Sequence, residues 1–120
     1  MSPEAMFNDQ RQVFLDNLVS GAAAHLPLVP GIKVSALRVG KQPGMALSIA
    51  REAQQAGQLQ RVLERRYERA QVFDGCFVYL DTQGALVVWH ALAPPGTPDK
   101  ILSRMLSLAD LEALDVRSGR

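Results

Sequence analysis

The stretch from Gly75 to Leu92 constrains the fold of this chain more than any other part of the sequence. It reads as a β-hairpin whose two arms, Cys76 to Leu80 and Ala85 to Trp89, are apolar on both faces. Strand side chains alternate between the two faces of a sheet, so a hairpin with one solvent-exposed face would alternate apolar and polar residues. We therefore expect other parts of the protein to bury both faces of the hairpin. The residues that bury the second face could equally belong to this chain or to another chain.

Length and composition narrow the classes of protein further. A chain of 120 residues predicts one domain, residues 1–120. Thirteen Lys and Arg against twelve Asp and Glu give a net charge of +1, which provides no broad field for attracting nucleic acid. No apolar run approaches the roughly twenty residues of a membrane span, and the first residues do not resemble a signal peptide. We expect a cytoplasmic protein that binds no nucleic acid and does not span a membrane.

Hydrophobic spacing of three and four residues predicts three helices, over residues 4–24, 51–71 and 98–114. Thr97 followed by Pro98 and Asp99 is a typical helix start, with a capping hydroxyl, a proline at the first helical position and an acid near the positive end of the dipole. The tail, residues 116–120, is expected to be disordered.

Alternating patterns predict strands over residues 32–39 and 45–50, followed by the hairpin with its turn at residues 81–84. The segment 45–50 is open to a second interpretation, as the start of the next helix. Residues 26–31 are expected to be a loop, because they contain two prolines and a glycine. The predicted fold is α+β, a twisted antiparallel sheet flanked by three helices in the order α-β-β-α-β-β-α.

The sequence offers little for catalysis. Its two histidines, His25 at a predicted helix end and His90 at a strand exit, have no partner at a recognisable spacing. The single cysteine, Cys76, lies among apolar residues, which favours a structural thiol and excludes an internal disulfide or a thiolate metal cluster. An enzyme would depend on His90, Cys76 and Tyr79 alone, so we expect no enzymatic activity, no catalytic residues, no metal and no cofactor.

Three arginines lie along one side of the middle predicted helix. Arg61, Arg65 and Arg69 lie four residues apart and would form a ridge suited to phosphates or an acidic partner. Glu64 and Glu68 alternate with them, so we expect a solvated face whose charges pair within the helix.

The tract from Leu63 to Leu92, with Asp81 and Gly84 at the hairpin turn and an amphipathic helix after it, resembles the C-terminal half of type III secretion chaperones of the Tir-chaperone kind. The resemblance implies a small cytoplasmic α+β homodimer of a Gram-negative bacterium, with a role in virulence and no catalytic activity. Such chaperones keep a secreted effector, or a component of the injection apparatus, partly unfolded on their surface. The client, and whether the dimer is a homodimer or a heterodimer, stay open.

The resemblance also implies which residues bind. The dimer interface would be formed by the middle helix and the hairpin, through Leu59, Leu63, Tyr67, Phe77, Tyr79, Val87 and Trp89. The client would lie on the first helix and the first strands, on Phe14, Leu18, Val34 and Leu37.

The chain departs from this family in two ways. The family places three strands between its first two helices, where two are predicted here, and its members are acidic, whereas this chain is close to neutral. The leading hypothesis is a non-enzymatic chaperone or adaptor for a secreted effector or a type III secretion component. The alternative is a regulatory or scaffold domain of the profilin or roadblock sort, which would bind a folded signalling partner.

Overall fold

The computed structural model describes residues 3–21, 24–92 and 97–115, and the predicted disordered tail lies outside them. The elements in chain order are α1 (Pro3–Ser20), β1 (His25–Val29), β2 (Ile32–Ala36), β3 (Gly44–Ile49), the 3-10 turn η1 (Arg51–Ala53), α2 (Gln58–Glu68), β4 (Cys76–Leu80), β5 (Leu86–Ala91), α3 (Pro98–Leu108) and the 3-10 turn η2 (Glu112–Leu114). None of the described helices is long and apolar enough to cross a membrane.

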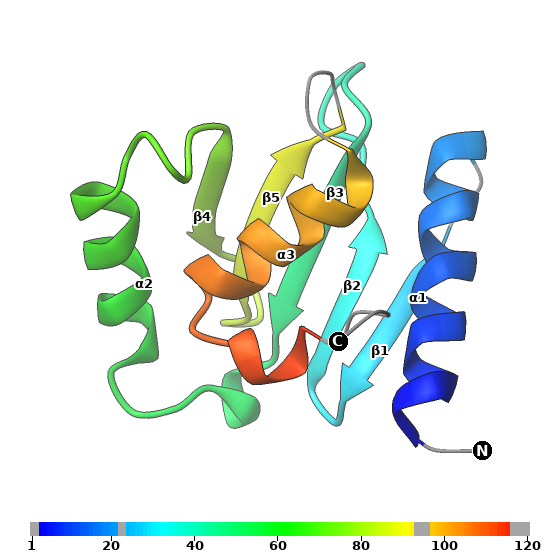
Figure 1. Cartoon of the computed structure of the whole chain (residues 1–120). Helices are drawn as coiled ribbons and strands as arrows, with labels where there is room; N and C mark the ends of the chain where they lie inside the picture. Colours follow the sequence, from blue (N-terminus) through cyan, green and yellow to red (C-terminus); the bar gives the residue numbers. More distant parts are fainter. Residues whose placement is uncertain (1–2, 22–23, 93–96, 116–120) are drawn as a thin grey trace.

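The five strands form one antiparallel sheet in the order β1-β2-β3-β5-β4. The three helices lie toward one face of it: α3 crosses the middle strands, α1 lies beside β1, and α2 runs next to β4 (Figure 1). The α+β class, the antiparallel sheet, the three helices and the hairpin are therefore confirmed.

The predicted order lacks one strand. Residues expected to form a loop instead form β1, which pairs with β2, so that the order is α-β-β-β-α-β-β-α. Pro27 is tolerated because β1 is an edge strand, where one side of the backbone needs no ladder partner. The segment left open between strand and helix is strand β3. Three strands between the first two helices also remove one of the two departures from the chaperone pattern.

Helix boundaries differ from the predicted ones where the backbone turns left-handed. The middle helix begins at Gln58 rather than Arg51, because Gly57 adopts a φ of 72° and serves as the N-cap. The last helix ends at Leu108, and Asp110 has a φ of 65°. The predicted start of α3 is confirmed, since the Thr97 hydroxyl accepts a hydrogen bond from the Lys100 amide at 3.3 Å.

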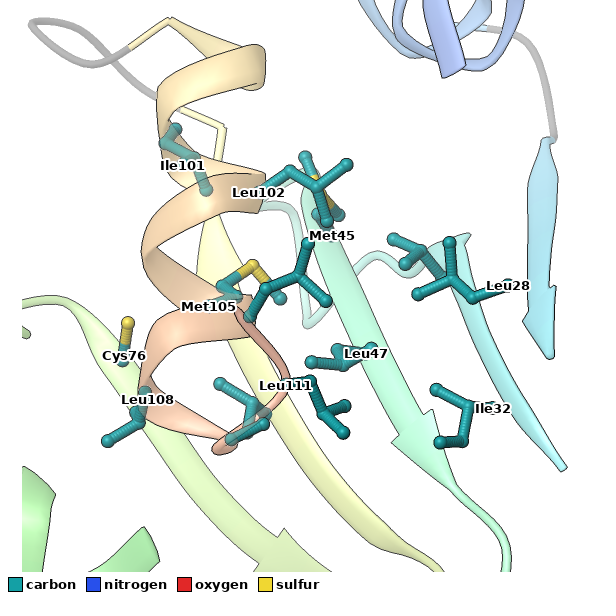
Figure 2. Packing of buried hydrophobic residues seen from close by; sticks show 14 of the residues in the cluster. Leu28, Ile32, Met45, Leu47, Cys76, Ile101, Leu102, Met105, Leu108 and Leu111 are labelled. Carbon is teal, nitrogen blue, oxygen red and sulfur yellow. The ribbon is translucent and has the colours of Figure 1, made fainter. Parts of the chain in front are cut away.

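The main core lies between the helices and one face of the sheet (Figure 2). Helix α3 is its centre and buries five residues, Ile101, Leu102, Met105, Leu106 and Leu108. These pack on the strand residues that point toward them, among them Met45 and Leu47 of β3. Helix α1 extends the core with Phe14, Leu15 and Leu18. One helix across the central strands therefore organises the whole layer.

The arginines of α2 do not pair within their own helix, contrary to the prediction. Arg61 and Arg65 form ion pairs with Asp110, at 3.2 and 3.5 Å, and Arg65 also pairs with Glu112 at 3.1 Å. The buried amide of Gln58 donates to the Ala109 carbonyl at 2.9 Å. These contacts attach α2 to the chain that follows α3, so Arg61 and Arg65 of the arginine row form a structural clamp on that side.

A second polar clamp attaches α1 to α3. Arg11 of α1 is only 7% exposed, although its side chain is charged. Its guanidinium donates to Asp99 at 3.0 Å, to Asp115 at 2.7 Å and to the Ser103 hydroxyl at 2.9 Å. A buried charge is tolerated here because both carboxylates and a hydroxyl satisfy its fork of donors.

We predict that Arg11→Met destabilises the protein by about 1–3 kcal/mol, because it keeps most of the packing volume but removes the hydrogen bonds from the guanidinium to Asp99, Asp115 and Ser103. The cost is limited by the exposure of Asp99, whose side chain is half exposed. The control is Gln12→Met, on the exposed side of α1, which should stay within about 0.5 kcal/mol. Urea unfolding followed by circular dichroism measures both, and equal unfolding free energies would contradict the clamp.

Candidate interaction surface on the open face of the sheet

The hairpin has one covered and one uncovered face. Its alternate residues, including Cys76, Leu86 and Val88, belong to the main core beneath α2 and α3. Helix α1 does not contribute to this cover, because it packs on α3 and on β1 at the far side of the sheet. The residues that alternate with these along the two strands point to the face opposite the main core. They are Phe77 and Tyr79 of β4, and Val87 and Trp89 of β5.

A small second cluster lies on this open face. Val87 and Trp89 are buried there with Ala46, apart from the main core. The Trp89 indole donates to the Leu37 carbonyl at 2.9 Å, and its ring centroid lies 6.0 Å from that of Phe77. The indole also lies over Gly44, so closely that a β-carbon there would come within 2.3 Å of the ring. The absence of a side chain at Gly44 is thus what lets the Trp89 ring approach the backbone of β3 so closely.

The open face is hollowed along its central strands. Small residues, Ser35 of β2 with Ala46 and Ser48 of β3, line a hollow of about 860 Å³. Larger side chains flank it, with Leu37 on one side and Tyr79 on the other, 38% and 41% exposed. The other residues that line it are Pro27, Leu28, Val29, Pro30, Gly31, Ile32, Lys33, Ala50, Asp81, Gln83, Ala85 and Val87. An apolar hollow with a few polar residues at its rim is typical of a protein docking surface.

The residues predicted for a dimer interface fall into two groups. Leu63 and Tyr67 project from α2 into solvent, and Tyr67 is 85% exposed, while Leu59 is partly buried against the core. Those of the hairpin lie on the open face, where Phe77 is 60% exposed. Arg66 donates to the Cys76 carbonyl at 2.9 Å, which holds α2 alongside β4. The exposed members of the two groups therefore lie near the β4 edge of the sheet, whereas Val87 and Trp89 are buried on β5. The role of these residues in a dimer stays a prediction.

Three of the four residues predicted to bind a client lie in the core. Phe14, Leu18 and Val34 are buried between α1, the sheet and α3, and only Leu37 reaches the surface. A client could touch the buried three only if the core opened. Sequence reasoning missed the small residues of the hollow, because Ser35, Ala46 and Ser48 carry no hydrophobic signal. Only the strand pairing brings them together.

The groups considered for chemistry are dispersed. His25 lies in β1 rather than at a helix end, and Nδ1 of His90 lies 2.7 Å from the Ala91 carbonyl oxygen. Burial raises the pKa of the Cys76 thiol to about 11, although nearby Arg104 and Arg66 act in the opposite direction. Within the described residues, no three His, Cys, Asp or Glu side chains are grouped as a metal site.

Comparison with known proteins identifies the family. The model of the HrpV-like family matches residues 4–114, so the chain belongs to that family, which is associated with type III secretion. The link to type III secretion is confirmed, whereas the match is not to the Tir-chaperone family that the sequence resembles. No curated protein and no solved structure matches the chain.

We predict that Gly44→Ala displaces Trp89 and costs about 1–3 kcal/mol through overpacking. Because Trp89 is the one tryptophan, its fluorescence reports the change directly, and emission should shift to longer wavelength as the indole meets water. The control is Gly40→Ala, where an added β-carbon meets nothing within 4 Å. The left-handed φ of +60° strains the backbone in this control and lowers stability, but the emission of Trp89 should stay unchanged. Unchanged emission in Gly44→Ala would contradict the close approach.

We predict that Cys76 reacts slowly with Ellman's reagent while the protein is folded. A pKa near 11 instead of 9.0 leaves about 100-fold less thiolate at pH 8, and burial hinders access as well. The rate in native buffer should therefore be at least about 100-fold below the rate in roughly 8 M urea, which exposes the thiol. Equal rates in the two solutions would refute an inert structural thiol.

Proposed function

We propose that this HrpV-like protein is a non-enzymatic adaptor or regulator of type III secretion, acting in the cytoplasm by binding another secretion protein. The family supplies the link to type III secretion. The observation that carries the binding role is the open face of the sheet, where apolar and aromatic side chains surround a hollow that nothing in the described chain covers. A sheet face of this kind is normally buried in a soluble protein.

The form of the hollow favours a protein partner over a small substrate. It is a broad depression lined by residues of all five strands, and its floor of small residues, Ser35, Ala46 and Ser48, comes from the two neighbouring strands β2 and β3. A sheet spaces its strands about 4.8 Å apart, so two strands match the roughly 10 Å width of one helix. We propose that an amphipathic helix of the partner lies along the hollow, its apolar stripe between Leu37 and Tyr79.

The rim of the hollow would orient the partner. Lys33 lies on β2 and Asp81 follows β4, so one positive and one negative group flank the apolar surface. Rim charges of opposite sign favour one orientation of a partner helix over its reverse and add little affinity. The chaperone-type role is thus a binding role, and the family match favours it over the roadblock-like alternative.

We predict that Ser48→Arg abolishes partner binding or weakens it at least about tenfold, because a long charged side chain would fill the hollow next to Lys33. The control is Gln12→Arg, which makes the same change in charge on the exposed side of α1. Each secretion protein of the source organism is co-expressed with the three forms, and the complex that co-purifies is measured by calorimetry.

Folding of both variants is checked by circular dichroism, and Gln12→Arg should bind like the wild type. A partner that binds Ser48→Arg as tightly as the wild type would place the docking surface elsewhere. Failure of every secretion protein to bind the wild-type chain would refute the adaptor role itself.

A further inference from the structure

The arginines of α2 fall into two sets. Arg61 and Arg65 pair with carboxylates that follow α3. Arg66, which is partly buried, uses only Nε, and this atom donates to the Cys76 carbonyl at 2.9 Å. Arg69 caps the C-terminal end of the helix and is exposed. Among the described residues no carboxylate forms an ion pair with Arg66 or Arg69, so this end of α2 carries two positive charges without counter-ions.

Helix α3 carries a second pair of basic side chains. Lys100 and Arg104 lie four residues apart, and therefore on the same side of the helix. Within the part of the chain that the structure describes, neither side chain forms an ion pair or a hydrogen bond, although Arg104 is partly buried. A partly buried guanidinium without a counter-ion is costly, because its charge is withdrawn from water and not compensated.

The thiol of Cys76 shows that the two helices bring these charges together. Burial raises its pKa, and Arg104 and Arg66 are the positive groups that oppose this rise. Because the interaction between charges weakens with distance, both guanidinium groups lie near the same sulfur atom. Figure 2 shows the Cys76 side chain on the side of the sheet that α3 covers. Asp74 also acts on this thiol, but it forms no ion pair with either arginine among the described residues.

Helix stability does not explain this basic cluster, which consists of Arg66, Arg69, Lys100 and Arg104. Like charges three or four residues apart on a helix repel each other, and each of the two helices contains such a pair. Lys100 also lies in the first turn of α3, where the helix dipole disfavours a cation. The dipole favours only the two arginines at the C-terminal end of α2. An anion bound from outside would remove the repulsion at both helices.

We propose that the basic cluster binds an acidic segment of a partner protein, whose carboxylates lie between the end of α2 and α3. A guanidinium binds a carboxylate through two parallel N–H donors, and both Nη groups of Arg66 are left for this purpose. Nucleic acid is disfavoured, because four charges on a chain with a net charge of +1 form no extended basic track. The cluster lies on the helix side of the sheet (Figure 1), so this second contact surface goes beyond the function proposed for the open face.

Binding of an acidic peptide tests the charge. The probe is rhodamine-labelled hexaglutamate, with hexaglutamine as the uncharged control, and fluorescence anisotropy measures affinity at about 50 mM salt, where screening is weak. The double variant Arg69→Gln and Arg104→Gln should bind hexaglutamate at least about fivefold more weakly than the wild type. The control is Arg38→Gln with Lys41→Gln, which removes the same charge from the loop between β2 and β3 and should change the affinity less than about twofold.

Carbodiimide coupling tests the location. The reagent joins a carboxylate to a neighbouring amine, and the three lysines of the chain, Lys33, Lys41 and Lys100, are all exposed. Coupled hexaglutamate should therefore be found mainly on Lys100, which mass spectrometry of the digested product identifies. Lys33 and Lys41 serve as internal controls, since they lie on β2 and on the loop after it.

Four results would overturn the proposal. They are no binding of hexaglutamate by the wild type, equal losses in the two folded double variants, coupling mainly to Lys33 or Lys41, and equally tight binding of an oligothymidylate of the same charge. Circular dichroism checks the folding of each variant. Ser48→Arg, which fills the hollow of the open face, should bind hexaglutamate within about twofold of the wild type. The test of the basic cluster is therefore separate from the test of the open face.

Discussion

The packing of α3 across β3 and β5 is the interaction on which the rest of the structure depends. It buries five residues of one helix against the central strands and joins the contributions of α1 and α2 into one core. It also covers one face of the sheet only. The arms of β4 and β5 carry apolar residues on both faces, so a two-layer fold of this kind leaves Phe77 and Tyr79 without cover.

The charged residues serve mainly to hold the helices around α3. Arg11 attaches α1 near the beginning of α3 through Asp99, and Arg65 attaches α2 beyond its end through Asp110 and Glu112. Each guanidinium satisfies several acceptors, as a partly buried cation requires. Arg61 and Arg65 of the arginine row are thus occupied, which leaves the open face and the basic cluster as the surfaces for recognition.

Local patterns predicted much of this fold. The hairpin and the capped start at Thr97 follow from residues close in sequence, and both are confirmed. Strand β1 was missed because Pro27 reads as a breaker unless the strand is known to lie at an edge. The pairing of Arg11 with Asp99 joins residues 88 positions apart and leaves no trace in spacing. The hollow could not be predicted, since Ser35 and Ser48 matter through the sheet register.

The register of the hairpin sets both the core and the proposed docking surface. The side chain of Tyr79 lines the hollow of the open face, while its neighbour Val78 packs against the main core. Tyr79 pairs with Val87, and Val78 pairs with Val88, so the same alternation runs through both strands. A shift of one residue in this pairing would exchange the two faces and turn core residues toward the hollow. The packing of α3 that stabilises one face therefore also fixes the shape of the other.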